Sequence, residues 1–271
     1  MTGIQPEIGV IGGSGFYSLL DEATTHSLDT PWGAPSGDIT IGSLAGRQVA
    51  FLPRHGADHR FPPHRVPYRA NLWALRALGV RQVLTASAVG SLVPEWGPGT
   101  LVVPDQVLDR TSGRAHTYVD ADAGVSHVSL ADPYFEAGRR AALRAAVSTG
   151  IAVRDGATLV VINGPRFSTR AESRDYQRSG ATIIGMTGMP ETALARELAL
   201  PLTSLCLVTD HDAGVEAGNG VTHAEVLEQF AANLPRLRTL LVATLAELPA
   251  VDRDAAFTEV YGSTPPAFDL P

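Results

Sequence analysis

The stretch LTSLCLVTDHDAGV, residues 202–215, is an apolar and β-branched run that ends in two aspartates separated by one histidine. The run indicates a buried strand, and side chains alternate across a strand. Asp210 and Asp212 are therefore expected on one side of the strand, with His211 on the other. Carboxylates at the end of a buried strand need a partner. We interpret them as acids or hydrogen-bonding groups for a ligand.

Small hydroxyl residues, glycines and one arginine follow other apolar runs. Ser14, Arg54, Ser87 and Thr187 each lie at or directly after the end of such a run. Hydroxyls and backbone amides can hold an anion, and a guanidinium offers phosphate a fork of donors. Together these residues predict a phosphate-binding cradle. Each stretch alone also fits an ordinary turn, and the stretch around Ser14 lacks the dinucleotide and Walker fingerprints.

Three histidines, His55, His59 and His64, have spacings that invite a metal-binding interpretation. Gly56 and the paired prolines that follow disrupt a helix, and no glutamate completes an HExxH arrangement. We therefore expect no metal site here. Arg54 and His55 at a strand end suit an oxyanion instead, and a solvated basic loop is the alternative.

The stretch NGPRFSTRAES, residues 163–173, leads from a strand into a helix. Thr169 and Glu172 form a capping box, which predicts where the helix begins. Phe167 lies in the connecting loop. An aromatic residue usually belongs to the core, but this one would alternatively offer a face for a planar ring to stack on.

Short apolar runs alternate with helical patterns along the chain. Such alternation predicts an α/β protein with a largely parallel or mixed central sheet. In these sheets ligands bind beyond the carboxyl ends of the strands, where most of the residues above lie. The expected strands cover residues 8–11, 49–53, 82–87, 158–162, 182–186 and 203–209, and the expected helices cover residues 68–79, 132–150 and 169–180.

A last long helix is expected after a second capping box, formed by Thr222 and Glu225. Apolar residues then repeat at spacings of three and four as far as Leu241. We expect residues 1–248 to form one domain. Residues 249–271 show no strong period, and we expect an irregular tail that packs on the body or on a neighbouring subunit.

The 271 residues are 44% hydrophobic and 18% charged, which suits a globular protein with a substantial core. The net charge is −7 and the basic residues are scattered, which argues against nucleic acid as a partner. Cys206 is the only cysteine, so it forms no disulfide within the chain. Neither a signal-peptide pattern nor a membrane-spanning apolar run is found, so we expect a cytoplasmic protein with no membrane partner.

Seven motifs, taken in order, resemble the 5′-methylthioadenosine phosphorylases of the trimeric purine nucleoside phosphorylase family. They are IGVIGGSG, PRHG, ANLWAL, AVGSL, NGPRFSTRAES, GMTGMPE and VTDHDAG. The resemblance implies a single α/β domain with a central mixed β-sheet flanked by helices. It also implies a homotrimer with active sites near subunit boundaries. The implied reaction is phosphorolysis, in which inorganic phosphate is a co-substrate and no metal or organic cofactor takes part.

The resemblance also implies roles for residues that match the motifs. Asp210 and Asp212 are the expected catalytic residues, because a carboxyl group near N7 of a purine can supply a proton if burial raises its pKa. The expected phosphate-binding residues are Ser14, Arg54, His55, Ser87, Ala88 (through its amide) and Thr187. The expected nucleoside-binding residues are Phe167, Ser168, Met186, Asp210, Asp212, His223, Val226 and Leu227, with His127 reaching into a neighbouring subunit's site.

The resemblance bears on the choice of base and of 5′ substituent. The 6-oxopurine branch of the family typically has asparagine where Asp210 stands and glutamate where Ser168 stands, so an adenine base is implied. A carboxylate acceptor matches the 6-amino donor. His223 departs from the pattern, because methylthioadenosine enzymes tend to have an apolar residue there and enzymes for ordinary nucleosides a histidine. A solvated residue at the helix start is the alternative for His223.

We therefore expect phosphorolysis of 5′-methylthioadenosine to adenine and 5-methylthioribose 1-phosphate, a step of purine salvage. Alternative substrates are another 5′-modified adenosine, such as a 5′-halo-5′-deoxyadenosine, or adenosine itself. A hydrolytic nucleosidase would use water and would not need the anion-binding residues. A non-catalytic purine-binding protein would bind adenine tightly without turning over any nucleoside.

Overall fold

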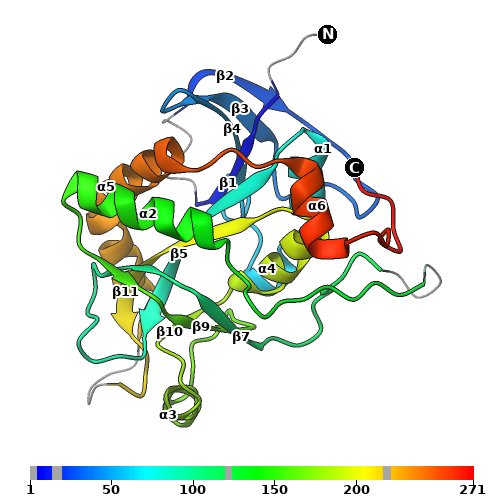
Figure 1. Cartoon of the computed structure of the whole chain (residues 1–271). Coiled ribbons are helices and arrows are strands. Elements are labelled where there is room, and N and C mark those ends of the chain that lie inside the picture. The colour runs from blue at the N-terminus through cyan, green and yellow to red at the C-terminus, as the bar shows by residue number, and fades with distance from the viewer. Residues whose placement is uncertain (1–4, 14–19, 120–123, 216–220) are drawn as a thin grey trace.

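The structure is a computed structural model that describes residues 5–13, 20–119, 124–215 and 221–271. These residues form one sheet with helices on both faces (Figure 1). The strands are β1 (Ile8–Gly12), β2 (Asp21–His26), β3 (Ile39–Leu44), β4 (Arg47–Pro53), β5 (Gln82–Ser91), β6 (Leu101–Val103), β7 (Gln106–Arg110), β8 (Val153–Asp155), β9 (Thr158–Ile162), β10 (Ile183–Gly185) and β11 (Leu202–His211). The α-helices are α1 (Tyr68–Ala77), α2 (Glu136–Thr149), α3 (Arg170–Arg178), α4 (Gly188–Glu197), α5 (His223–Glu247) and α6 (Arg253–Tyr261).

The sheet is mixed, as the alternating pattern predicts. Its order is β2-β3-β4-β1-β5-β10-β9-β7, with β11 paired to β5 and β6, and β8 paired to β6. The neighbours β4, β1, β5 and β11 run parallel, whereas β10 runs antiparallel to β5. Because parallel neighbours end at the same edge of a sheet, the residues that follow these four strands come together in space.

Helices pack on both faces of the sheet, and β4 shows the two layers. Val49 and Phe51 belong to a hydrophobic cluster with α2 and α5. Ala50 and Leu52, which point to the other face, belong to a cluster with α1 and α4. Figure 1 shows α2 lying beside α5. Burying both faces anchors the strands from which the candidate site is built.

Both predicted capping boxes are confirmed. The Thr169 hydroxyl accepts from the N–H of Glu172, whose carboxylate accepts from the N–H of Thr169, and α3 begins at the next residue. Thr222 and Glu225 make the same pair of bonds at the start of α5. Each box satisfies two N–H groups that have no partner within the helix. The first turn of α5 is thereby held in a defined place.

The irregular structure expected for the tail is wrong over residues 253–261, which form α6. The carboxylate of Asp252 accepts from the N–H of Ala255 over 2.8 Å and caps this helix. Glu259 pairs with Arg196 of α4 at 2.8 Å. The tail therefore packs on the body of its own chain. Its short helix lacks an apolar period that would have signalled it.

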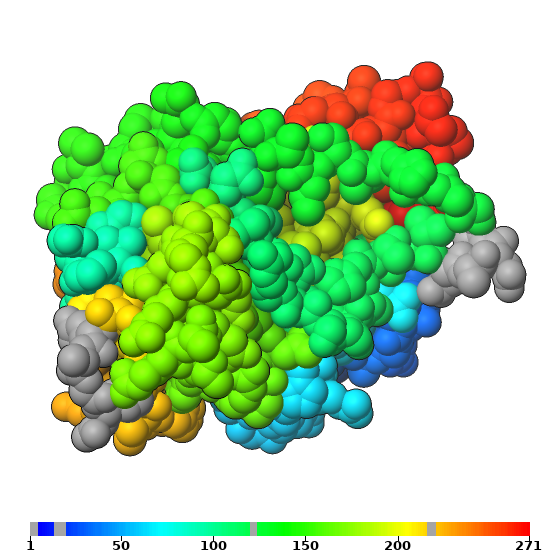
Figure 2. Space-filling model, turned by 90° about the horizontal axis from the view of Figure 1, so that it is seen from below, coloured from blue at the N-terminus to red at the C-terminus, as the bar shows by residue number. Residues whose placement is uncertain are grey.

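The lower face of the molecule brings distant segments together. In Figure 2 the yellow-green surface of α3 and its flanking loops lies near the orange start of α5 and the cyan segment before α1. The red surface of α6 and the tail lies at the opposite end of this view. No helix in the described parts of the chain combines the length and apolar character that crossing a membrane requires.

Candidate active site

The two aspartates lie at and just beyond the carboxyl end of β11. Asp210 and Asp212 both line one cavity. The ring of His211 lies away from it, with Nε2 3.1 Å from the carbonyl oxygen of Pro94. The alternation predicted for this strand end is therefore confirmed, and it delivers two carboxyl groups to the same space.

The side chain of Asp210 is partly buried. Burial raises its pKa, and the neighbouring Asp212 charge acts in the same direction. The Thr209 hydroxyl donates to Oδ2 over 2.8 Å and opposes this shift. A carboxyl group whose pKa is raised holds its proton closer to neutral pH. Asp210 can therefore act as a general acid.

Asp212 is only 3% exposed. Burial raises its pKa, and the hydroxyls of Ser173 and Ser168 oppose the shift. Its Oδ2 atom has no hydrogen-bond partner among the described residues. Buried polar atoms are nearly always hydrogen-bonded, so an unsatisfied carboxyl oxygen on a cavity wall points to a ligand donor.

The cavity has a volume of about 810 Å³, which is within the range of small-molecule sites. Most of its wall comes from the carboxyl ends of the central strands, the loop before α3 and the first turns of α5. The predicted site residues that line it are Arg54, His55, Ser87, Ala88, Phe167, Ser168, Met186, Thr187, Asp210, Asp212, His223, Val226 and Leu227. The structure thus brings together most of the predicted site, while the role of each residue stays a prediction.

Arg54 is 2% exposed and makes an extensive set of bonds. Its Nε and Nη2 atoms donate to the two carboxylate oxygens of Glu191, each over 2.9 Å. Nη1 donates to the carbonyl oxygen of Ala86 over 3.0 Å, and Nη2 to that of Ile11 over 3.5 Å. The fork of donors expected to face an oxyanion therefore binds Glu191 instead. One of the five N–H groups, on Nη1, has no partner among the described residues.

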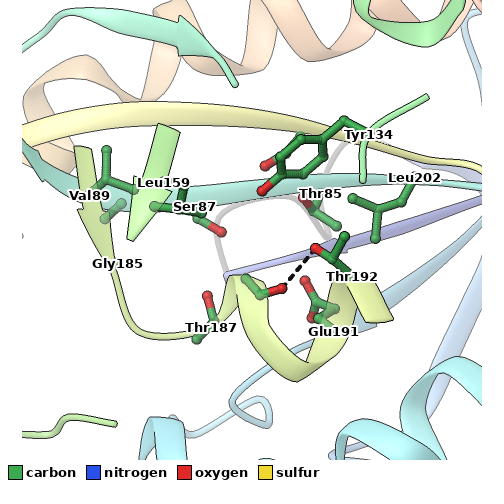
Figure 3. A pocket seen from close by; sticks show the side chains of 13 residues that line it. Thr85, Ser87, Val89, Tyr134, Leu159, Gly185, Thr187, Glu191, Thr192 and Leu202 are labelled. Atoms are coloured by element: carbon green, nitrogen blue, oxygen red, sulfur yellow. Dashed lines mark hydrogen bonds between the residues drawn. The ribbon is translucent and has the colours of Figure 1, made fainter. Parts of the chain in front are cut away.

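Ser87 and Thr187 reach the same region from β5 and from the residue before α4. Both line the large cavity and also a small pocket, which Figure 3 shows. Hydroxyls both donate and accept, so these side chains can bind phosphate oxygens. The two hydroxyls thus support the predicted anion site independently of Arg54.

His55 lies beside Arg54 and is neutral at pH 7. Burial lowers its pKa from 6.5 to about 4, and the charge of Arg54 acts in the same direction. Its Nδ1 atom lies 2.8 Å from the carbonyl oxygen of Phe61. Because a carbonyl only accepts, Nδ1 carries the proton and Nε2 is an acceptor. His55 can therefore accept from a protonated phosphate oxygen but cannot act as a cation.

Phe167 and Met186 line the part of the cavity between the loop before α3 and β10. Gly164 has a φ of +60°, and a Cβ there would lie 2.5 Å from Sδ of Met186. Glycine is required for this backbone conformation and for the approach of Met186. The apolar surface of these two side chains suits a planar base and a sugar ring.

His223, Val226 and Leu227 line the cavity from the first turns of α5. The spacing of three and four residues puts them on one face of the helix. Leu227 is 54% exposed, which is unusual for a large apolar side chain in this structure. The capping box at Thr222 thus places one imidazole and two apolar side chains at the same end of the cavity.

Two predicted residues are not brought to this cavity by the described structure. Ser14 lies outside the described residues. His127 is exposed and does not line the cavity of its own chain. Its contribution to a neighbouring subunit's site stays a prediction.

Several cavity residues were not predicted as site residues. Phe61, Pro63, Phe230 and Leu234 line the wall. The spacing of Phe230 and Leu234 after His223 continues one helix face, which was the available signal. Glu191 was also missed, although it ends the GMTGMPE motif. Its contact with Arg54 spans 137 residues, so no local pattern indicates it.

The structure also bears on metal binding. Within the described ranges, no group of three or more His, Cys, Asp or Glu residues could hold a metal ion. Of the three histidines whose spacing invites a metal-binding interpretation, His55 and His59 stack their rings on each other, with centroids 4.6 Å apart.

A family model described as the phosphorylase superfamily matches residues 7–246. The chain belongs to the phosphorylase superfamily. The matched span contains every described residue that lines the cavity and ends before α6. The candidate site of this phosphorylase is therefore part of the family's common domain.

Relatives of this phosphorylase carry two kinds of name. It is 56% identical over 276 residues to the purine nucleoside phosphorylase of Streptomyces coelicolor, with 99% of each chain covered. It is 52% identical over 265 residues to the S-methyl-5′-thioadenosine phosphorylase of Mycobacterium tuberculosis, with 97% of each chain covered.

A solved structure shares the fold of this phosphorylase. The methylthioadenosine phosphorylase of Schistosoma mansoni in complex with adenine superimposes with a TM-score of 0.89 at 35% identity, covering 94% of this chain and 97% of that one. The fold predicted from the resemblance, a purine nucleoside phosphorylase-like α/β domain, is confirmed.

Proposed function

We propose that this phosphorylase cleaves 5′-methylthioadenosine with inorganic phosphate and releases adenine and 5-methylthioribose 1-phosphate. A phosphate oxygen bonds to C1′ while the bond between C1′ and N9 breaks and leaves its electron pair on the base. The observation that carries this proposal is the presence, in one cavity, of two carboxyl groups with raised pKa and a set of anion-binding groups. Relatives called S-methyl-5′-thioadenosine phosphorylase support the choice of substrate.

On the base side, Asp210 supplies the acid. As N9 gains electron density, the purine becomes basic at N7, and a protonated carboxyl group there neutralises the leaving group. Asp212 accepts a hydrogen bond from the ligand through its unsatisfied Oδ2 atom. A 6-amino group is such a donor, whereas a 6-oxo group is not. This supports selection of adenine.

On the phosphate side, Ser87, Thr187 and the remaining N–H of Arg54 donate to phosphate oxygens. His55 accepts through Nε2 from a protonated oxygen. The sugar carbon gains oxocarbenium character in the transition state, and an oriented phosphate dianion stabilises that charge. Holding the phosphate against C1′ also removes the entropic cost of bringing the two reactants together.

A second candidate substrate, adenosine, is favoured by the position of His223 on the cavity wall. An imidazole can hydrogen-bond a 5′-hydroxyl, whereas the neighbouring Val226 and Leu227 offer an apolar surface that suits a thioether. The 5′ substituent of a 5′-halo-5′-deoxyadenosine is intermediate between a hydroxyl and a thioether in its fit to these side chains. The name of the Streptomyces coelicolor relative, purine nucleoside phosphorylase, is consistent with an ordinary nucleoside.

The test is adenine release from 5′-methylthioadenosine with and without inorganic phosphate, compared with adenosine and a 5′-halo analogue. We expect turnover only with phosphate and the highest kcat/KM for 5′-methylthioadenosine. Turnover that does not depend on phosphate would indicate a hydrolytic nucleosidase. Tight binding of adenine without turnover of any of these nucleosides would indicate a binding protein.

The proposal extends to cofactor use, assembly and location. We propose that the enzyme needs no metal or organic cofactor and works as a homotrimer in the cytoplasm. The family resemblance supports each of these points. We expect the enzyme to keep full activity after metal ions are chelated. We also expect light scattering to give three times the mass of the chain. A fully active monomer would also contradict the role of His127 in a neighbour's site.

A further inference from the structure

We infer that Glu191 is a positioning residue for phosphate, acting through Arg54; this inference rests on the proposed function. The side chains of Arg54 and Glu191 are 3% and 4% exposed, so the ion pair is almost fully shielded from water. Both carboxylate oxygens accept from the guanidinium at 2.9 Å. Such paired contacts fix the plane of the guanidinium as well as its position.

The pair joins the residue that follows β4 to the first turns of α4. Arg54 follows β4, whereas Glu191 lies in the first turns of α4, four residues after Thr187. Figure 3 shows Glu191 and Thr187 on the same side of the small pocket, facing Ser87 of β5. The ion pair therefore ties the residue that follows β4 to the helix start that carries Thr187.

The ion pair with Glu191 also limits which N–H groups of Arg54 are left to bind a ligand. Four of its five N–H groups are held by Glu191, Ala86 and Ile11. Because the pair is neutral as a whole, Arg54 contributes a directed donor rather than an unbalanced charge. Without the carboxylate, the guanidinium loses two of its contacts and keeps only those with the carbonyl oxygens of Ala86 and Ile11. The donor on Nη1 would then lose its fixed orientation at the cavity wall.

The test replaces Glu191 with glutamine, which has nearly the same shape but no charge. In Glu191→Gln we expect the KM for inorganic phosphate to rise at least tenfold, while the KM for 5′-methylthioadenosine stays within about twofold. Glu191→Asp keeps the charge with a shorter reach, and we expect an intermediate KM for phosphate. If Glu191→Gln does not fold, the rise in the KM for phosphate is tested in Glu191→Asp instead.

A matched control is Glu197→Gln, because Glu197 is a second buried glutamate of α4 and, unlike Glu191, does not line the small pocket that holds Ser87 and Thr187. Its carboxylate accepts from the N–H of Tyr118. We expect Glu197→Gln to change stability without raising the KM for phosphate. A selective rise in Glu191→Gln alone separates positioning from a general loosening of α4.

A binding measurement keeps the inference separate from the proposed function. Inorganic phosphate should raise the Tm of the wild type, and this rise should shrink in Glu191→Gln but not in Glu197→Gln. If the three proteins show these Tm differences but the wild type cleaves no nucleoside, the proposed function fails and the inference stands. An unchanged or lowered phosphate KM in Glu191→Gln, or no effect of phosphate on the wild-type Tm, would overturn the inference.

Discussion

The Nδ1 atom of His55 lies 2.8 Å from the carbonyl oxygen of Phe61, which determines the nitrogen that carries the proton. The ring is neutral because burial lowers its pKa from 6.5 to about 4. A phosphate bound as proposed would therefore meet a hydrogen-bond acceptor at His55, beside Arg54, whose charge is balanced by Glu191. The proposed phosphate site therefore offers directed hydrogen bonds rather than net positive charge.

The lowered pKa of His55 predicts a pH dependence of stability. Between about pH 6.5 and pH 4 the unfolded chain binds a proton at this residue and the folded chain does not. The stabilisation from neutral His55 is thus fully present above pH 6.5 and is lost as the pH falls towards 4. Relative to His55→Asn, the wild type should lose more stability over this interval in urea titrations. Parallel curves for the two proteins would contradict the lowered pKa.

Asp210→Asn should lower kcat/KM on adenine nucleosides strongly. Loss of a general acid typically costs ~10²–10⁴-fold in rate. The variant should tolerate 6-oxopurines relatively better, because the amide of asparagine can donate to O6. The measurement is the ratio of methylthioadenosine to methylthioinosine turnover in both proteins. If that ratio is the same, Asp210 does not recognise the base.

Gly90→Ala should displace the Asp210 carboxyl group. A Cβ at residue 90 would lie 2.8 Å from Oδ1 of Asp210 and 3.0 Å from Cγ2 of Ile184, so a neighbour must move. A shift of ~1 Å in a catalytic group can cost about 10²-fold, and we expect a 10- to 100-fold drop in kcat/KM. Gly97→Ala is the control, because its nearest neighbour would be Cε1 of His211 at an ordinary 3.9 Å. Equal activities of the two variants would show that Asp210 tolerates displacement.

His223→Val should shift the preference among 5′ substituents. Burying an imidazole against a thioether without a partner costs on the order of 1–3 kcal/mol, whereas a 5′-hydroxyl supplies that partner. The preference for methylthioadenosine over adenosine should rise about tenfold, since ~1.4 kcal/mol corresponds to a factor of ten. The measurement is kcat/KM for both substrates and for a 5′-halo analogue. An unchanged ranking would leave His223 as a solvated residue at the start of α5.

The parts of the fold that the sequence predicts well depend on local interactions. The capping boxes at Thr169 and Thr222 need only a partner three residues away, so the starts of α3 and α5 were correctly expected. The placement of Asp210 and Asp212 on one side follows from the alternation of a strand. The helix in the tail was missed because its short sequence has little periodicity and it packs on α4, far away along the chain.

Sequence alone determined which residue types stand at the carboxyl ends of the strands, and hence that a cavity with acids and anion donors could form there. Only the tertiary structure decided what those residues can still offer a ligand. Arg54 is identified by its motif, but its fork is bound to Glu191, 137 residues away. His55 belongs to the same motif, but burial decides that it is neutral. The physical reason is that protonation and available hydrogen bonds depend on solvent exclusion and on contacts between distant segments, which no local pattern encodes.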